Sequence, residues 1–581
     1  MIERSQALAA LAQDEFDVVV IGGGITGAGV ALDAATRGYS VALLEGADFA
    51  SGTSSRSSKL VHGGLRYLQN FDLGLVREAL LERQLMVALA PHLVRPLPLV
   101  VPAFEGAHPD RMVGVGLNLY DVMSVDRDRL RSRRGRRSRA GVSAERRSPG
   151  RASGEQGIQA RAVEGSESWS PERHRMISGE EVLELLPAFS RSSIGREPTS
   201  GYLFYDCQTD DVRLVLTVLG EAERFGAVCA NRLHVSGLLE QEGRTRGVRA
   251  LDTESGAELE VRAANVINAT GVWADRLRPG ELRDEAEMPR IRPSRGTHVI
   301  LSHEDLPLVG GAIVPAGSGR SIFALPWLGR TLVGTTDNDY DGELAHVRPS
   351  SEDVDYLLQA VNDFFGATLD PGDLVGAFAG VRPLISTGDP KKSVDISRKA
   401  ELYETSSGMI TITGGKLTTW RRMAKMTVDR LVERDARDAP CRTHEIPLGQ
   451  AIAADDLPRV EGVPAESYSA LAARYGDAAH QVLALAGERG ELAQPIVPGL
   501  PDLLAEVVLA ARSEQARSIG DVLLRRTRLG LLAARELGGV GGPIDRTADV
   551  LARELGWSEE RAGLEIERFA AEAQAEGILS A

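Results

Sequence analysis

The chain opens with a short apolar run, a glycine-rich turn, a helical pattern and a second apolar run. Residues 17–21 (DVVVI) are mostly β-branched, residues 27–37 have helical composition and stop at Gly38, and residues 40–44 read SVALL. Short uninterrupted apolar runs are typical of strands in parallel sheets, which are buried on both faces. The pattern therefore predicts a strand–helix–strand unit at the start of the chain.

Apolar runs and helical stretches continue to alternate up to about residue 435, which predicts a mixed α/β body. We predict that Asp206, Asp210 and Asp211, in the run YDCQTDD, cap and orient the helix that starts at Val212, rather than act as catalytic carboxylates. The later predicted strands are 245–251, 258–267, 297–301, 321–325 and 331–335, and the predicted helices include 73–90 and 211–225.

A different composition follows the α/β body. Prolines within residues 436–448 close it, and residues 466–575 are rich in Ala, Leu, Glu and Arg at helical spacing. We therefore divide the chain into an α/β domain at 1–435 and an all-helical C-terminal domain at 436–581. The run RRTRLG at 525–530 is predicted to be a helix face that makes ion pairs.

Residues 127–151 interrupt the α/β pattern. They hold eleven arginines and two acidic residues, together with serine and glycine and almost no apolar residue. Such a segment cannot bury enough apolar surface to offset its ordering entropy, so residues 127–170 are predicted to be a flexible insertion. A solvated loop is one interpretation, and a polybasic contact with anionic lipid headgroups is the other.

Composition indicates a folded, acidic chain. Apolar residues make up 43 % and charged residues 26 % of the sequence, and the formal net charge is −15, which disfavours a protein that coats nucleic acid. Cys207, Cys229 and Cys441 are scattered, which fits a reducing compartment and neither a disulfide framework nor a zinc site. Without an apolar run of spanning length or a signal-like start, we expect a cytoplasmic protein that can still lie peripherally on a membrane.

The turn between the first strand and the first helix carries a dinucleotide-binding fingerprint. Gly22 permits the tight turn, Gly24 lets the backbone approach a pyrophosphate, and Gly27 lets helix and strand pack closely. Glu45, at the end of the second strand, is placed to accept hydrogen bonds from the ribose of an adenosine, and it disfavours a 2′-phosphate. The alternative is a glycine-rich turn that binds no ligand. The strand, the helix and the acid at their expected positions argue against it.

The segments further along favour FAD over NAD, because FAD is longer and can be contacted from distant parts of the chain. Residues 51–68 are dense in hydroxyls and glycines, Thr270-Gly271 closes a second β-rich run, and a glycine turn at 413–419 leads into a helix. The predicted cofactor contacts outside the fingerprint are Thr53, Ser54, Ser58, Lys59, Leu60, His62, Thr270, Gly271, Gly414, Gly415, Lys416, Leu417 and Thr418.

At this level of detail the sequence resembles the aerobic, membrane-associated FAD-dependent glycerol-3-phosphate dehydrogenases. The resemblance covers about residues 22–420 and, for the helical domain, 441–575. It implies a Rossmann-type FAD-binding lobe with an inserted α+β substrate-binding cap, followed by the helical domain. The segments that carry it are GGGITGAGVALDAATRG, SSKLVHGGLRYL, YDCQTDDVRLVL, INATGVWAD, FALPW with VGTTD, AGVRPL and GGKLTTW.

The resemblance also implies oxidation of sn-glycerol 3-phosphate to dihydroxyacetone phosphate, with electrons passed through FAD to a quinone. His62 is the first candidate for the base that accepts the hydroxyl proton, because its ordinary pKa lies near neutrality. Lys416 is the alternative base and could stabilise anionic reduced flavin. Arg320 and Arg382 would hold the substrate phosphate in bidentate fashion, although Arg382 could instead make a surface salt bridge.

Several alternatives remain open at this level. An FAD-dependent amine or amino-acid oxidase of the same architecture would not need two arginines for a phosphate. A glycerophosphate oxidase would use O2 in place of quinone, and sequence does not separate the two acceptors. A flavin-containing module that binds RNA through the arginine-rich insertion is the least favoured, because the rest of the chain is acidic. A homodimer is compatible with the sequence, which does not fix the oligomeric state.

Overall fold

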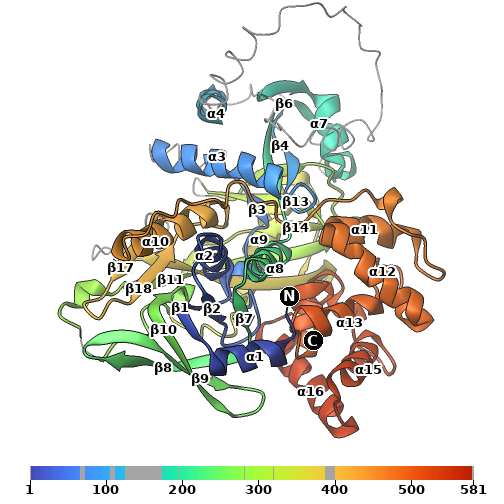
Figure 1. The fold of residues 1–581 in the computed structure, drawn as a ribbon. Coiled ribbons are helices and arrows are strands. Elements are labelled where there is room, and N and C mark those ends of the chain that lie inside the picture. The colour runs from blue at the N-terminus through green and yellow to red at the C-terminus, as the bar shows by residue number, and fades with distance from the viewer. Residues whose placement is uncertain are drawn as a thin grey trace, which may run out of the picture.

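The computed structural model describes residues 2–65, 72–104, 111–124, 173–193, 195, 197–280, 282–317, 320–386 and 399–578. The predicted arginine-rich insertion at 127–170 lies outside the described residues. Two sheets, helices that cover them and a group of C-terminal helices make up the described part of the chain (Figure 1).

Sheet A is built around parallel strands. In the described part of the chain its order is β17-β18-β10-β1-β2-β7, with β9 and β8 continuing as antiparallel strands from β10. The neighbours β18, β10, β1, β2 and β7 all run parallel, so their carboxyl ends meet at one edge. The strands are β1 (Glu15–Ile21), β2 (Val41–Leu44), β7 (Val228–Ala230), β8 (Leu233–Gln241), β9 (Arg244–Asp252), β10 (Glu258–Asn268), β17 (Ala400–Glu404) and β18 (Ile410–Gly414).

Helices cover the central strands of sheet A, which explains their continuous apolar sequence. Val18 and Val20 of β1 pack into the cluster beneath α2 (Ile25–Thr36), whereas Val19 and Ile21 pack into the cluster that contains α1 (Arg4–Gln13). The helices α10 (Trp420–Arg434), α2 and α8 (Asp211–Arg224) lie side by side (Figure 1). The predicted strand–helix–strand opening is confirmed, with the helix two residues earlier at its start.

Sheet B is the predicted inserted cap. In the described part of the chain its order is β15-β11-β14-β13-β12-β4-β6-β3, with β16 beside β11 and β5 beside β6. The strands are β3 (Leu60–Val61), β4 (Arg95–Phe104), β5 (Arg175–Ser178), β6 (Pro198–Gln208), β11 (Ile291–Ser302), β12 (Gly311–Pro315), β13 (Ser321–Trp327), β14 (Arg330–Gly334), β15 (Asn338–Asp339) and β16 (Leu374–Ile385); the helices are α3 (Leu73–Leu89), α4 (Arg111–Ser124), α7 (Gly179–Leu185) and α9 (Ser351–Phe365).

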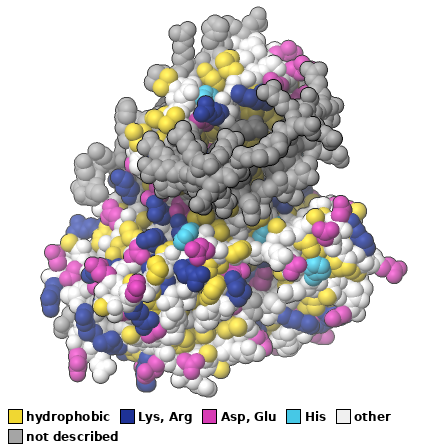
Figure 2. Space-filling view, turned by 45° about the horizontal axis from the view of Figure 1, so that its top comes forward, with side chains coloured by type: hydrophobic (Ala, Val, Ile, Leu, Met, Phe, Trp, Pro, Cys, Tyr) yellow, Lys and Arg dark blue, Asp and Glu magenta, His cyan; other side chains and the backbone are white. Residues whose placement is uncertain are grey.

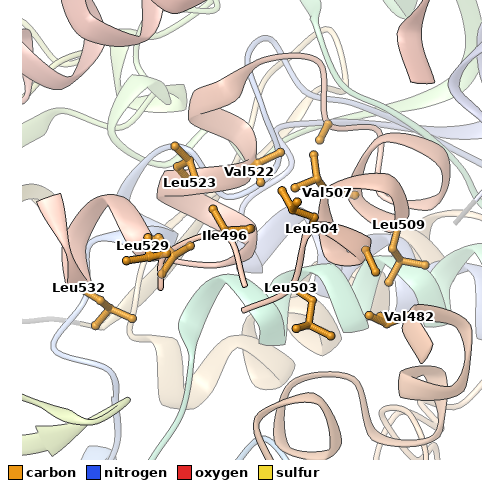
Figure 3. Packing of buried hydrophobic residues seen from close by; sticks show 14 of the residues in the cluster. Val482, Ile496, Leu503, Leu504, Val507, Leu509, Val522, Leu523, Leu529 and Leu532 are labelled. Carbon is orange, nitrogen blue, oxygen red and sulfur yellow. The ribbon is translucent and has the colours of Figure 1, made fainter. Parts of the chain in front are cut away.

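The C-terminal residues fold into a helical domain, as predicted. Its core gathers leucines and valines from successive helices, among them Val482, Leu504, Val507 and Leu523 (Figure 3). The same apolar cluster includes Phe378 of sheet B, so the domain is packed directly onto the cap. The helices are α11 (Ala465–Tyr475), α12 (Ala479–Glu488), α13 (Leu504–Ser513), α14 (Leu529–Leu532), α15 (Pro543–Leu555) and α16 (Glu559–Ala575), with a π-helical turn at Asp521–Arg526.

Two features of the described residues bear on function: the charges on their surface and the length and apolarity of their helices. Basic and acidic side chains are interspersed over much of the described surface that faces the viewer in Figure 2. Within the described ranges, none of the helices is both long enough and apolar enough to cross a membrane.

The chain passes from sheet A to sheet B and back twice, so residues distant in sequence meet where the two sheets join.

Candidate functional site

The glycine fingerprint forms a tight cradle between β1 and α2. Gly22 has a φ of +110°, and a Cβ there would lie 2.7 Å from the carbonyl oxygen of Ala269. A Cβ on Gly27 would lie 1.9 Å from the carbonyl oxygen of Gly22, so the helix packs directly against the turn. Gly24 is the residue before α2, whose first-turn N–H groups lack intrahelical partners and can bind an anion. Gly22 and Gly27 therefore have the structural roles that the sequence predicts, and the approach of a pyrophosphate to Gly24 stays a prediction.

Glu45 is tied to this turn from the end of β2. One carboxylate oxygen accepts a hydrogen bond from the N–H of Gly23 at 2.7 Å, and the other accepts from the N–H of Ala47 at 2.8 Å. Burial raises the pKa of Glu45, and these two backbone bonds oppose the rise. The carboxylate lies beside the fingerprint, as predicted, and its contact with an adenosine ribose stays a prediction.

We call residues 46–59, between β2 and β3, the cofactor loop. It connects the glycine turn to sheet B through hydroxyl groups. The Ser54 hydroxyl accepts from the N–H of Ile25 at 2.9 Å, at the N-terminus of α2. Thr53 donates to the carbonyl of Val381 on β16 at 2.6 Å, and Ser58 Oγ lies 2.9 Å from Nε2 of His298 on β11. The loop thus has the hydroxyl groups that the sequence predicts, placed between the two sheets.

Lys59 ends the cofactor loop, and its side chain points into the protein. Its Nζ donates to the carbonyl of Ser55 at 2.5 Å and to both carboxylate oxygens of Asp211, at 2.7 and 2.9 Å. Burial lowers the pKa of Lys59 to about 7; nearby Arg528 lowers it further and Asp211 opposes the shift. The ammonium group is engaged by Asp211, the backbone N–H donates to Ser57 Oγ and the carbonyl accepts from the Thr209 N–H, so the predicted cofactor contact of Lys59 stays a prediction. The next residue, Leu60, is buried in β3.

The other predicted cofactor segments lie at the carboxyl edge of sheet A, where the glycine fingerprint also lies. Thr270 and Gly271 follow β10, and Thr413 of β18 donates to the carbonyl of Gly271 at 3.1 Å. Gly414 and Gly415 both have positive φ, and a Cβ on Gly415 would lie 2.3 Å from the Met423 sulfur. They turn the chain so that Lys416, Leu417 and Thr418 lead into α10. The Lys416 Nζ is shielded from solvent.

His62 lies where the cofactor loop, sheet B and this last segment meet. Its N–H donates to Thr418 Oγ1 at 3.1 Å, and the Thr418 hydroxyl donates back to the His62 carbonyl at 3.2 Å. The imidazole packs edge-on against Phe323 of β13, with ring centroids 6.3 Å apart. The half-buried side chain of His62 therefore lies beside the cofactor loop and the 414–418 segment, both of which the sequence predicts to contact the cofactor.

The two predicted phosphate ligands differ in their surroundings. Arg382 on β16 is half-buried, donates to Thr335 Oγ1 at 3.1 Å and to the Thr336 carbonyl at 3.2 Å, and pairs with Asp337 at 3.4 Å. Arg320 is exposed, at the turn between β12 and β13. The strands β14 and β11 separate β13 from β16 in the sheet. Arg382 thus makes the salt bridge considered as its alternative role, and a joint phosphate contact with Arg320 stays a prediction.

Two of the three aspartates predicted to cap α8 have other roles. Asp210 accepts from the N–H groups of Val212 and Arg213 and is the cap. Asp211 accepts from the N–H of Val212 at 3.0 Å and also bonds Lys59, whereas Asp206 pairs with Arg83 and accepts from the Tyr120 hydroxyl at 2.8 Å. The prediction was wrong for Asp206, whose partners are distant in sequence and buried, and incomplete for Asp211, which has a buried distant partner in addition to its bond at the helix start.

Sequence reasoning also missed His298 of β11. It is buried, stacks on Phe378 at 4.8 Å, and bonds the Ser58 hydroxyl of the cofactor loop. Burial, together with the charges of Lys59 and Arg382, lowers the pKa of His298 well below its ordinary value, so the imidazole is neutral at neutral pH. The sequence feature that could have identified His298 is the presence of a histidine within the otherwise apolar run THVIL.

Comparisons with known proteins agree with this arrangement. Residues 17–430 match the family described as FAD dependent oxidoreductase, and residues 441–562 match the C-terminal domain of alpha-glycerophosphate oxidase. The chain is 35 % identical to a glycerol-3-phosphate dehydrogenase of Mycobacterium leprae, over 100 % of this chain and 92 % of the relative. It is 33 % identical to the aerobic glycerol-3-phosphate dehydrogenase of Bacillus subtilis, over 90 % and 89 %.

A solved structure extends the similarity to the whole fold. The glycerol-3-phosphate dehydrogenase from Bacillus halodurans, complexed with FAD, aligns with a TM-score of 0.74 and 27 % identity, covering 99 % of this chain and 97 % of the other.

Proposed function

The chain belongs to the family of FAD-dependent oxidoreductases, and on that basis we propose that it oxidises sn-glycerol 3-phosphate to dihydroxyacetone phosphate. One observation carries the proposal: the fingerprint turn, Glu45, Thr270 and the Gly414–Lys416 turn meet at the carboxyl edge of sheet A, with His62 beside them. Ligands of open α/β sheets bind at this edge. Full-length similarity to proteins named glycerol-3-phosphate dehydrogenase supports the substrate.

The residues present fit FAD. A Cβ on Gly24 would lie 3.0 Å from Ser54 Oγ, so the glycine leaves space that a side chain would fill beside the helix N-terminus. We assign the diphosphate to this cradle, the adenosine ribose to Glu45, and the remainder to the Thr270 and Gly414–Thr418 segments. Bound FAD would accept a hydride from the secondary carbon of the substrate and pass electrons to an acceptor.

The chain's own side chains then have defined tasks. We assign to His62 the acceptance of the substrate's hydroxyl proton, since its ordinary pKa suits a base near neutral pH. Lys416 stands two residues before Thr418, which bonds the His62 backbone; it is the alternative base, and its charge would stabilise anionic reduced flavin. Arg382 binds the substrate phosphate, and exposed Arg320 is the second cation assigned to it. The contacts of Arg382 with Thr335 and Asp337 fix the guanidinium before substrate arrives.

The proposal is tested by anaerobic titration of the FAD-loaded protein with sn-glycerol 3-phosphate, following the visible flavin band. We expect stoichiometric bleaching. A protein that holds FAD but does not bleach would exclude this substrate and direct the search to amino acids and amines.

Quinone is the acceptor we propose, and O2 is the second candidate, because the C-terminal residues match a domain described from alpha-glycerophosphate oxidase. Reduced protein is mixed with a soluble quinone or with air-saturated buffer in a stopped-flow instrument. Faster reoxidation by the quinone supports a dehydrogenase, and faster reoxidation by O2 supports an oxidase.

Replacing Arg382 with alanine is expected to raise KM for sn-glycerol 3-phosphate by about 10- to 100-fold, because a charge-assisted hydrogen bond to phosphate is lost. The same change at exposed Arg320 is expected to have a smaller effect. Steady-state kinetics of both variants, with sn-glycerol 3-phosphate and with glycerol as substrates, measure the change in KM. Arg278→Ala, which removes an exposed arginine paired with Glu285, is the control. Equal effects on both substrates would exclude phosphate binding.

We also propose peripheral membrane binding on the cytoplasmic face, through α4. Val115, Leu119 and Val122 are 62 %, 38 % and 66 % exposed and follow one another at helical spacing. The sequence that follows α4 is the arginine-rich insertion, whose charge suits anionic lipids.

A double change of Val115 and Val122 to aspartate is expected to abolish sedimentation with anionic vesicles, since it places charge on the face that would enter the lipid. Val540→Asp changes an exposed valine of the C-terminal domain and should leave binding intact. Deletion of 127–170 tests the insertion by the same assay. Unchanged sedimentation of the double variant would contradict the proposed surface.

A further inference from the structure

Arginines of the C-terminal domain bind the first part of the cofactor loop. Asp48 pairs with Arg526, which donates from Nη2 to Oδ1 at 2.9 Å and makes a second bond to Oδ2. Arg525 donates from Nε to the same carboxylate at 2.8 Å. The side chains of Asp48 and Arg526 are both 0 % exposed. Residues 48 and 526 are thus joined by a buried two-point contact between the domains.

A second contact binds the middle of the loop. Arg528 donates from Nη2 to the Ser55 carbonyl at 2.9 Å and to Asp211 at 3.2 Å. Lys59 bonds the same two groups from the other side. Burial by itself raises the pKa of Asp211, but Lys59 and Arg528 outweigh it, so the carboxyl is ionised at neutral pH. The sequence predicted ion pairs for this RRTRLG segment, which the structure confirms, on a face that is buried.

The two contacts enclose two of the residues assigned to the cofactor. Thr53 and Ser54 lie between Asp48 and Ser55, in a loop whose regular structure is limited to a single 3₁₀ turn at Thr53–Ser55. A third ion pair, Arg56 with Glu576 at 2.5 Å, joins the middle of the loop to the end of α16. The loop conformation therefore depends on groups supplied by the C-terminal domain.

We propose that Arg526 and Arg528 are positioning residues for FAD: by binding Asp48, Ser55 and Asp211 they hold the cofactor loop in the shape that binds the cofactor. The inference rests on the FAD assignment of the proposed function and not on its substrate. Buried ion pairs are poor sources of net stability but demand one geometry, which suits a role in shaping a loop.

The test compares Arg528→Met with Arg474→Met in the full-length protein. In the Arg528 variant Lys59 still pairs with Asp211, so the acid is not left without a cation. Arg474 is a control that is also buried and pairs with Asp502 and Glu506 inside the C-terminal domain, away from the loop. FAD affinity is measured by flavin fluorescence quenching, bound-flavin environment by visible circular dichroism, and stability by thermal melting.

We expect Arg528→Met to raise the Kd for FAD at least about 10-fold and to change the flavin dichroism, since the bond to the loop at Ser55 and the bond to Asp211, which holds Lys59 of the loop, are both lost. Arg474→Met should lower the melting temperature and leave the Kd unchanged. A wild-type Kd in Arg528→Met, or an equal rise in both variants, would overturn the proposal.

A milder variant keeps the test valid if Arg528→Met fails to fold. Arg528→Lys keeps the charge but loses the guanidinium, which bonds Ser55 and Asp211 through Nη2 while Nη1 donates to the Leu524 carbonyl. We expect faster hydrogen exchange at residues 47–59 and a smaller rise in the Kd for FAD; exchange equal to wild type would overturn the proposal. Loss of FAD in these variants would stand even if sn-glycerol 3-phosphate failed to bleach the wild type, so the two proposals fail separately.

Discussion

Flavin reduction by sn-glycerol 3-phosphate is expected to slow about 10²- to 10⁴-fold when His62 is replaced by alanine, which is the usual contribution of a general base. The substitution removes the imidazole but keeps the backbone bonds between His62 and Thr418. FAD should therefore remain bound, and the loss should fall on the reduction step. Anaerobic stopped-flow absorbance gives this rate directly.

The controls separate a base from a packing residue. His174→Ala removes another half-buried histidine, which pairs with Asp121, and should leave the rate unchanged. Added imidazole should restore part of the rate to His62→Ala if a proton acceptor is what was lost. A wild-type rate in His62→Ala would exclude His62 as the base and transfer the role to Lys416.

Replacing Gly27 with alanine is expected to weaken FAD binding about 100-fold, because overpacking by one methyl group displaces helix and turn together. The added Cβ would lie 1.9 Å from the Gly22 carbonyl, a backbone atom that cannot turn aside like a flexible side chain. The expected result is apoprotein that retains its secondary structure. Fluorescence titration with FAD and far-ultraviolet circular dichroism measure the two properties.

Gly220→Ala is the matched control, since the same methyl group is added to a glycine of α8 that has open space around it. It should bind FAD as the wild type does and gain slightly in stability, by about 0.5–1 kcal/mol. Wild-type FAD affinity in Gly27→Ala would contradict the assignment of the fingerprint as the diphosphate cradle.

Local patterns were sufficient to predict the elements that carry the fingerprint. The β-branched run before Gly22 forms β1, and the alanine-rich run after Gly24 forms α2, because both patterns can be read within a few residues, even though β1 pairs with distant β10. The α2 boundary differed by two residues, since Gly24 precedes the helix and the first turn already includes Ile25. The helical C-terminal domain was predicted for the same reason, from apolar spacing alone.

The partners of buried charges could not be predicted this way. Arg526 pairs with Asp48, which stands 478 positions earlier, and no local spacing connects them. Arginines are also expected at the surface, so an Arg-rich run is normally interpreted as a solvated face. Asp211 likewise lies next to a helix start, which suggested a cap, while its carboxylate bonds Lys59 across the domain.

The strand order of sheet A has a consequence for how the protein is made. β1 lies between β2 and β10, and β10 lies next to β18, so the fourth and fifth parallel strands in chain order are contributed by residues 258–268 and 410–414. A ribosome delivers the chain from its N-terminus, and the glycine turn emerges long before these neighbours or Arg528 exist. Truncated chains should therefore not retain flavin, and cofactor insertion is confined to the end of synthesis or later.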